Sequence, residues 1–217
     1  MKSPRQMPFK PVRISRQRGV SLFFSLVCLV AVMLAAVALV RSVDTTTLIA
    51  GNLAFQRSAT ASGDAGTEAA ITWLAQIEAA NVLTNVLTNP SHPFNLNNAG
   101  NGYYSALDPA KSLTASGGFA WTDSDSKLAT PLTGDGSGNV VRYIIQRMCR
   151  TPNVAVKDAN CMYSGAIQDT NGQNIPLPQE VCKGEGCPVA GQTPQIRITS
   201  RTDGPKNTRS YVQAFVY

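Results

Sequence analysis

The sequence predicts an α+β protein in which a long N-terminal helix packs on a C-terminal antiparallel β-sheet with disulfide-closed loops. No proline lies between Pro11 and Pro90, as expected for one very long helix or two in series. Residues 90–217 hold 10 of the 13 prolines and 13 of the 17 glycines, which is typical of a turn-rich β domain. With 217 residues the chain has room for one modest domain and an appendage, which excludes a large multidomain enzyme.

The positive charge of the chain is confined to residues 1–19. The formal net charge is +6, and this segment carries six basic residues and no acid: Lys2, Arg5, Lys10, Arg13, Arg16 and Arg18. Residues 20–217 therefore hold 13 basic and 13 acidic residues and balance to zero. Because the excess charge lies in this leader, we expect no nucleic-acid partner.

Residues 20–40 form a run without charge, proline or glycine, closed by Arg41. At about 1.5 Å per residue, this helix would be about 31 Å long and would match a bilayer core of roughly 30 Å. The basic leader before it favours a cytoplasmic N-terminus and a head outside the cytoplasm. An uncleaved single-pass anchor is the simplest interpretation, since no small-x-small signal-peptidase site follows the run.

The junction Arg18-Gly19-Val20-Ser21-Leu22 places a glycine between the basic cluster and the apolar run. It resembles the class III leader of type IV pilins and type II secretion pseudopilins. The resemblance implies that prepilin peptidase cuts between Gly19 and Val20 and methylates the new amine. The apolar helix would then be kept, first as a membrane anchor and later as part of a filament core.

The fifth residue after this cleavage site is Phe24, where most pilins carry glutamate. In the family that glutamate is thought to pair with the N-terminal amine of a subunit already in the filament. The resemblance therefore implies that this chain is a first or tip-proximal subunit, for which no such contact is needed. The alternative is that Phe24 is one more apolar residue in a membrane span.

Residues 41–89 are predicted to be the soluble half of the long helix. Ile71, Leu74 and Ile77 follow one another at three-residue spacing and form an apolar stripe suited to packing on a sheet. Glycines cost about 1 kcal/mol in a helix interior, so the sequence predicts a bend or break near residues 63–66. The helix is expected to end at Asn89-Pro90.

The head, residues 90–217, is predicted to contain an interior strand at 140–145 and a weaker one at 118–122. Residues 195–199 and 210–217 flank a polar turn at 203–207, a pattern that predicts a hairpin. The C-terminal segment is therefore expected to be a strand of the sheet.

Two segments resemble the PilX family of minor pilins. Residues 49–56 (IAGNLAFQ) with 68–71 (EAAI) resemble its "MAGN … AFQ … AEAAL" succession, with Ile49 in place of methionine. Residues 196–213 resemble its C-terminal "YRITArG … NT … VQS" pattern. The resemblance implies a pilin-like fold and a role in priming a type IV pilus with other minor pilins, the major pilin and the inner-membrane assembly platform. It also implies a PilY-family tip adhesin as partner, and hence adhesion and twitching motility.

Four of the five cysteines lie in the head, and an exported head meets an oxidising compartment. Two disulfides are expected among Cys149, Cys161, Cys182 and Cys187, for which three connectivities are possible. Nearness in sequence favours Cys149–Cys161 and Cys182–Cys187. The fifth, Cys28, is interpreted as an ordinary apolar residue of the span. Zinc is disfavoured because C-x11-C and C-x4-C are poor spacings for a zinc site.

No cofactor or metal is expected. Residues 122–126 and 135–139 offer spaced oxygen ligands for calcium, but neither completes an EF-hand loop, and polar turns are the favoured interpretation. His92 is the single histidine and is expected at the surface of a loop rather than as a catalytic base. No G-x-S-x-G, Walker A or H-E-x-x-H motif occurs, so an enzyme is not expected.

The predicted location is the bacterial inner membrane, with a periplasmic head, and later the pilus at the cell surface. Two other interpretations remain open at this level. One is a type II secretion pseudopilin that likewise lacks the glutamate. The other is an uncleaved single-pass receptor or binding module.

Overall fold

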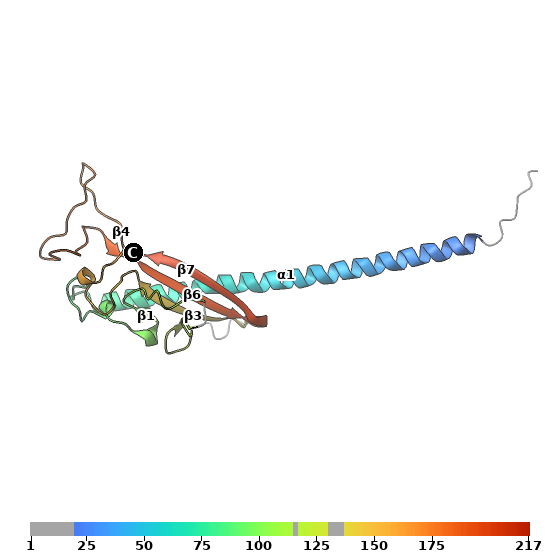
Figure 1. The fold of residues 1–217 in the computed structure, drawn as a ribbon, viewed down its shortest axis with the longest axis horizontal. Helices are drawn as coiled ribbons and strands as arrows, with labels where there is room; N and C mark the ends of the chain where they lie inside the picture. Colours follow the sequence, from blue (N-terminus) through green and yellow to red (C-terminus); the bar gives the residue numbers. More distant parts are fainter. Residues whose placement is uncertain (1–19, 115–116, 130–136) are drawn as a thin grey trace, which may run out of the picture. The chain divides into compact units, whose positions relative to one another are not determined.

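The structure is a computed structural model and describes residues 20–114, 117–129 and 137–217. Helix α1 runs without interruption from Val20 to Ala80 (Figure 1). The chain forms two compact units, Met1–Gly51 and Asn52–Tyr217, so the first part of α1 belongs to one unit and the remainder to the other.

The first unit contains α1 up to Gly51, and its described residues through Ala50 are all exposed. Hydroxyl side chains here bond back to carbonyls of their own helix: Thr45 Oγ1 donates to the Arg41 carbonyl and Thr46 Oγ1 to that of Ser42. Such bonds satisfy the threonine hydroxyls inside the helix. The threonine-rich stretch after Arg41 is therefore compatible with unbroken helix.

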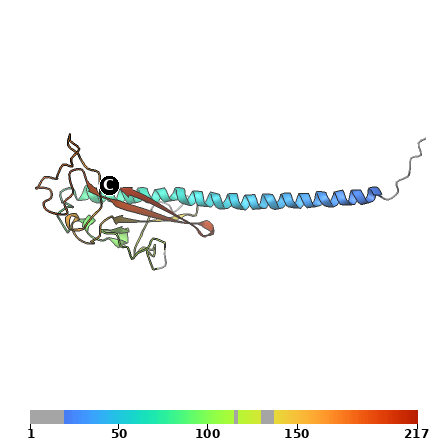
Figure 2. The ribbon, with the colours of Figure 1, turned by 45° about the horizontal axis from the view of Figure 1, so that its top comes forward.

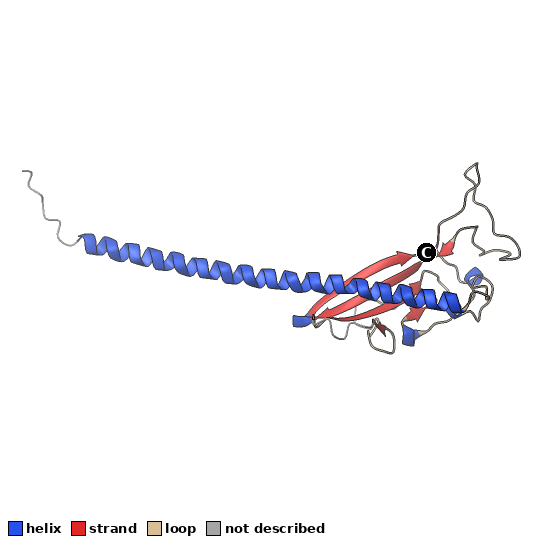
Figure 3. Ribbon diagram, turned by 180° about the vertical axis from the view of Figure 1, so that it is seen from behind, coloured by secondary structure: helices blue, strands red, loops and turns tan. Residues whose placement is uncertain are grey.

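The second unit is built on a mixed five-stranded sheet (Figure 3). Its long strands are β3 (Val140–Arg147), β6 (Ile196–Gly204) and β7 (Thr208–Val216), which pair antiparallel in that order. Two-residue strands border β3: β1 (Tyr103–Tyr104) is parallel to it and β2 (Lys127–Leu128) antiparallel. A separate pair is formed by β4 (Tyr163–Ser164) and β5 (Thr193–Pro194).

Short 3₁₀ helices connect these strands. They comprise Pro93–Asn95, Ala99–Asn101, Val156–Asp158 and Pro205–Asn207. The last of them joins β6 to β7, with Lys206 and Asn207 at positive φ. The predicted terminal hairpin and the predicted interior strand are thus confirmed, each longer than the sequence pattern indicated.

The strand alternation gives the sheet two covered faces. Val141, Tyr143 and Ile145 of β3 and Ile198 of β6 are buried in one cluster with Ala70 of α1. Ile144 points to the opposite face, into a cluster with aromatic residues of the 104–121 segment. Residues 52–80 of α1 lie along the first face (Figure 2).

The predicted bend at Gly63 and Gly66 is wrong, because these glycines are where the helix lies against the sheet. A Cβ at Gly63 would come within 2.7 Å of Val212 Cγ2, and one at Gly66 within 2.7 Å of both Ser200 Cβ and Val141 Cγ1. The Gly63 carbonyl also accepts a 2.7 Å hydrogen bond from Ser200 Oγ. Their lack of a side chain allows close packing, which offsets their low helix propensity.

The prediction of the helix's buried face was also partly wrong. The buried positions of α1 are small residues, namely Ala59, Gly63, Gly66 and Ala70. Ile71, from the predicted apolar stripe, is instead 44% exposed. Trp73 does reach the core, where its ring lies 5.4 Å from that of Tyr103.

The helix ends at Ala80, earlier than the predicted end at Asn89-Pro90. Asn81 Nδ2 donates to the Ile77 carbonyl at 2.8 Å, and Thr84 Oγ1 donates to the Asn81 carbonyl at 2.8 Å. These local side-chain bonds give the backbone an alternative to helix, so turns replace it before the proline is reached.

The weaker predicted strand at 118–122 is not a strand. Trp121 has φ +58°, and the backbone N–H groups of Ala120 and Thr122 donate to the Asp125 carboxylate rather than to a neighbouring strand. This turn places Phe119 and Trp121 in the aromatic cluster over Ile144. Burial of the two rings, not sheet pairing, therefore accounts for the apolar pattern.

Candidate functional site

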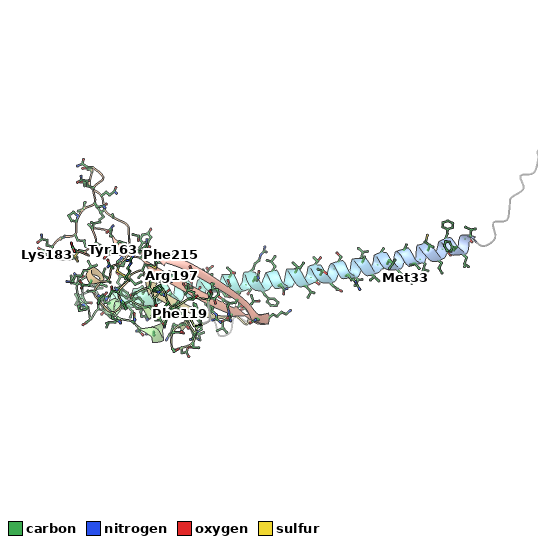
Figure 4. The ribbon with its side chains drawn as sticks, viewed as in Figure 1. Met33, Phe119, Tyr163, Lys183, Arg197 and Phe215 are labelled. Atoms are coloured by element: carbon green, nitrogen blue, oxygen red, sulfur yellow. A yellow bond between two sulfur atoms is a disulfide. The ribbon has the colours of Figure 1, made fainter. Side chains whose placement is uncertain are left out.

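The first part of α1 presents a continuous apolar surface. Leu22 is 75% exposed and Leu39 68%, and every residue from Val20 to Val40 is exposed. Figure 4 labels Met33 on this helix, 61% exposed. Helix α1 is long and apolar enough to cross a membrane. An apolar surface on all sides of a helix is stable in lipid or against other helices, but not in water.

The structure describes only one of the two residues at the predicted cleavage site. Val20 is the first residue of α1, whereas Gly19 lies outside the described residues. Phe24 is 63% exposed, and its ring packs edge-on against Phe23 with centroids 6.4 Å apart. Val20–Val40 contains no charged residue, so this part of the helix has no carboxylate at the position where type IV pilins carry glutamate.

Both favoured disulfides are present. Cys149–Cys161 joins the segment after β3 to the segment before β4, and the two cysteines also form a β-bridge. Cys182–Cys187 closes a turn in the excursion between β4 and β5. The fifth cysteine, Cys28, is a free and exposed residue of the apolar helix.

A buried arginine, which sequence reasoning did not single out, organises the end of the sheet. Arg147 is 2% exposed, and its Nε donates to the Ser105 carbonyl at 2.9 Å and its Nη2 to the Val154 carbonyl at 3.2 Å. Its Nη1 donates to Asn95 Oδ1. Burial lowers the pKa of Arg147 from its ordinary value by desolvation, but the guanidinium stays charged at any physiological pH.

The sequence carried a signal for this arginine. Arg147 has the same strand parity as Val141, Tyr143 and Ile145, which face the core, so a charged residue at this position had to be inward-facing and hydrogen-bonded. Asn95 extends the network by donating to the carbonyls of Val86 at 2.7 Å and Asn89 at 2.8 Å.

His92 belongs to the same region, and its expected surface position is wrong. The side chain is 4% exposed, and its Nδ1 accepts a 3.1 Å hydrogen bond from the Phe94 backbone N–H. Desolvation, with a smaller contribution from the Arg147 charge, lowers the pKa of His92 from its ordinary value. The histidine therefore caps a 3₁₀ turn in its neutral form.

The outer face of the sheet carries an aromatic cluster with cations over its rings. Lys111 Nζ lies 5.3 Å from the Phe119 ring centroid, and the Arg201 guanidinium 5.7 Å from that of Trp121. The Tyr104 hydroxyl donates to the Asp125 carbonyl at 2.9 Å, and burial raises the pKa of Tyr104 to about 12. These contacts hold the 104–121 segment against the sheet.

The described residues of the two segments considered for calcium make other contacts. In residues 122–126, Asp123 pairs with Arg142, a contact that lowers the pKa of that carboxyl, and Asp125 accepts the two backbone N–H groups described above. In the second segment, Asp135 and Gly136 lie outside the described residues. Asn139 Nδ2 donates to Ser62 Oγ at 2.8 Å and so ties this loop to α1. Among the described residues, no group of three or more His, Cys, Asp or Glu side chains is placed to hold a metal.

Comparison of the chain with protein-family models, with curated proteins and with solved structures finds no match in any of the three.

Proposed function

We propose that this protein is a minor pilin of the PilX type. Prepilin peptidase cleaves it between Gly19 and Val20 and methylates the new amine. Its head then joins other minor pilins to prime assembly of a type IV pilus in the inner membrane. In this proposal the protein has no enzymatic activity and acts by assembly with other subunits.

The observation that carries the proposal is the continuity of α1. An apolar, membrane-capable segment starts directly at Val20, the residue after the leader glycine, and the same helix continues to Ala80. Its last part packs on the mixed sheet through Gly63 and Gly66. A subunit that must first be anchored in a membrane and later packed in a filament needs one helix of this kind.

The uncharged start of the helix supports a place at or near the pilus tip. With Phe24 exposed where other pilins carry glutamate, a subunit of this kind cannot pair with the amine of one added before it. We therefore assign it to initiation, where it would support a PilY-family tip adhesin and, through it, adhesion and twitching motility.

Intact-mass spectrometry of the protein from its native membrane tests the proposal. The expected chain lacks residues 1–19, begins with N-methylated Val20 and is about 4 Da heavier after reduction, because two disulfides take up four hydrogens. A Gly19 substitution is expected to leave the precursor intact and to abolish pilus function. An unprocessed, unmethylated wild-type chain would contradict the pilin assignment and favour an anchored binding module.

A further inference from the structure

One edge of the sheet is long and uncovered. In the strand order β1-β3-β6-β7, strand β7 is terminal, and among the described residues it pairs only with β6. Its nine residues, Thr208–Val216, stay in unbroken register with β6 and contain neither proline nor lysine. Within the described part of the chain, no backbone–backbone hydrogen bond outside this pairing involves β7 beyond its first residue, Thr208. About half of the strand's N–H and C=O groups therefore face away from the sheet.

At the opposite edge of the sheet, the strands are short and expose few unpaired backbone groups. Strands β1 and β2, which border β3, have two residues each. Short edge strands, prolines, lysines and bulges are the ordinary devices that keep an edge from pairing with another chain. Strand β7 has no proline, lysine or bulge and carries one charged side chain, Arg209, so its open edge is suited to accept a further strand.

An apolar groove lies beside the C-terminal end of β7. It has a volume of about 410 Å³ and includes Val216 of β7 together with Ile71 and Leu74 of α1. Both belong to the predicted apolar stripe: Leu74 packs partly buried against the core, as expected, whereas Ile71 is exposed. Val212 and Val216 face α1 by strand alternation, so the inward-facing side chains of a strand paired with β7 would extend toward this groove.

The charge of the β6–β7 hairpin favours an acidic binding partner for this edge. Residues 196–216 carry four basic residues, Arg197, Arg201, Lys206 and Arg209, against the single acid Asp203, a net charge of +3. The remainder of residues 20–217 then has nine basic and 12 acidic residues, a net charge of −3. Arg197 lies opposite Phe215 across the two strands, and both are labelled in Figure 4. Arg201 and Arg209 both pair with Asp203, whose single charge leaves the hairpin positive. Arg197 donates to Gln146 Oε1 at 2.6 Å and has no carboxylate partner among the described residues.

We propose that β7 is a docking edge for an extended, acidic segment of a different polypeptide. The segment adds a strand beside β7, places apolar side chains toward Ile71 and the groove, and presents carboxylates to the net positive charge of the hairpin, where Lys206 and Arg209 lie nearest the open strand. A second copy of this chain is a poor occupant, because two hairpins of charge +3 would face each other. The proposal goes beyond the pilin assignment and does not depend on it.

The test uses the full chain in detergent micelles and a synthetic nine-residue peptide that alternates valine with glutamate. Binding is followed by fluorescence anisotropy, and amide hydrogen exchange is measured residue by residue. The expected result is new protection at alternate residues of β7, those whose N–H groups face outward. The matched peptide that alternates valine with lysine is expected to bind roughly tenfold or more weakly, because its charges repel the hairpin.

Variants of the chain locate the site. The double variant Lys206→Glu, Arg209→Glu is expected to lower the affinity for the acidic peptide roughly tenfold. The control Lys127→Glu, on strand β2 at the far edge of the sheet, is expected to leave that affinity unchanged. Ile71→Ser, at a half-exposed position, tests the groove and is expected to weaken binding without unfolding the head.

Three results would overturn the proposal. The first is no binding of the acidic peptide, and the second is equal binding of both peptides without protection of β7. The third is protection of β7 by self-association when no peptide is present, which would make a second copy the occupant. None of these results bears on cleavage after Gly19, so failure of this proposal and failure of the pilin assignment are distinguishable.

Discussion

Two glycines of α1 set how closely the helix approaches the sheet. The positions where Gly63 and Gly66 would carry a Cβ are taken by Val212, Val141 and Ser200. Gly51 of the same helix has nothing within 4 Å of that position. The same residue type thus has opposite energetic consequences within one helix, because only packing distinguishes the sites.

Gly66→Ala is expected to destabilise the head by about 1–2 kcal/mol. The methyl group gains up to about 1 kcal/mol of helix propensity, but it forces a shift in a packed core at a cost of about 1–3 kcal/mol. Gly51→Ala is the matched control and is expected to be neutral or to gain up to about 1 kcal/mol. Urea unfolding of the full chain in detergent measures both. An equal free energy of unfolding in the two variants would show that the close contact at Gly66 does not contribute to stability.

His92 gives the head a dependence on pH. Its folded-state pKa is lowered below the ordinary value of about 6.5, so the unfolded chain binds a proton more readily than the folded one. Stability from this group is complete above about pH 6.5 and is lost as the pH falls, by at most about 1.4 kcal/mol per pH unit.

The measurement is the urea midpoint between pH 7 and pH 5. His92→Asn keeps a side-chain acceptor for the Phe94 N–H and removes the single histidine, so its midpoint is expected to vary less over this range. A wild-type midpoint that follows the same pH dependence as the variant would mean that His92 titrates normally in the folded chain.

At the scale of elements, the disulfides tie loops to a sheet that is otherwise small. Cys149–Cys161 spans 12 residues of sequence and fixes the segment whose Val154 carbonyl accepts from Arg147. Cys182–Cys187 spans five residues within the excursion between β4 and β5, where most side chains are exposed. The first bridge therefore supports the core and the second constrains a surface loop.

Removing the first bridge by Cys149→Ser with Cys161→Ser is expected to cost about 3 kcal/mol, and removing the second about 2 kcal/mol, from the entropy of loop closure. Cys28→Ser is the control, since this cysteine is free, and the unfolding free energy of the head is expected to stay unchanged. Thermal unfolding followed by circular dichroism ranks the three variants. A loss of stability in Cys28→Ser as large as the loss in the Cys149→Ser, Cys161→Ser variant would contradict this ranking.

At the scale of the whole molecule, we propose that the absence of a charged residue at the start of α1 determines the position of the protein in the pilus. Phe24→Glu places a carboxylate in the apolar segment at a cost of at most about 2.5–3.5 kcal/mol, the value for a charge at the centre of a span, because Phe24 lies near the start of the helix. The remaining apolar residues are expected to keep the helix inserted in the membrane.

The expected effect of Phe24→Glu is a change in the number of pili, because the subunit gains the contact made by subunits added later. Phe23→Glu is the matched control, with the same charge one position away from the pairing site. Pilus number and length are counted by electron microscopy, and membrane insertion is checked by fractionation. Unchanged pili in the Phe24 variant would count against the priming role.

The sequence by itself determined the main elements of the chain. Hydropathy and proline spacing predicted a helix from Val20, and the β-branched clusters with a polar turn predicted β3 and the β6–β7 hairpin. The nearness of each cysteine pair favoured the bridges found. These features could be predicted because each depends on residues close together in the sequence, through periodicity, turn chemistry or short loop closure.

Only the tertiary structure decided which residues face one another. Gly63 and Gly66 read as helix breakers until Val141 and Ser200 were placed against them, and His92 as a surface residue until Arg147 and Phe94 enclosed it. The open edge of β7 and its groove likewise follow from strand order, which local patterns do not encode. The physical reason is that burial, desolvation and close packing depend on contacts between segments distant in sequence, so the same residue can break a helix or allow it to pack.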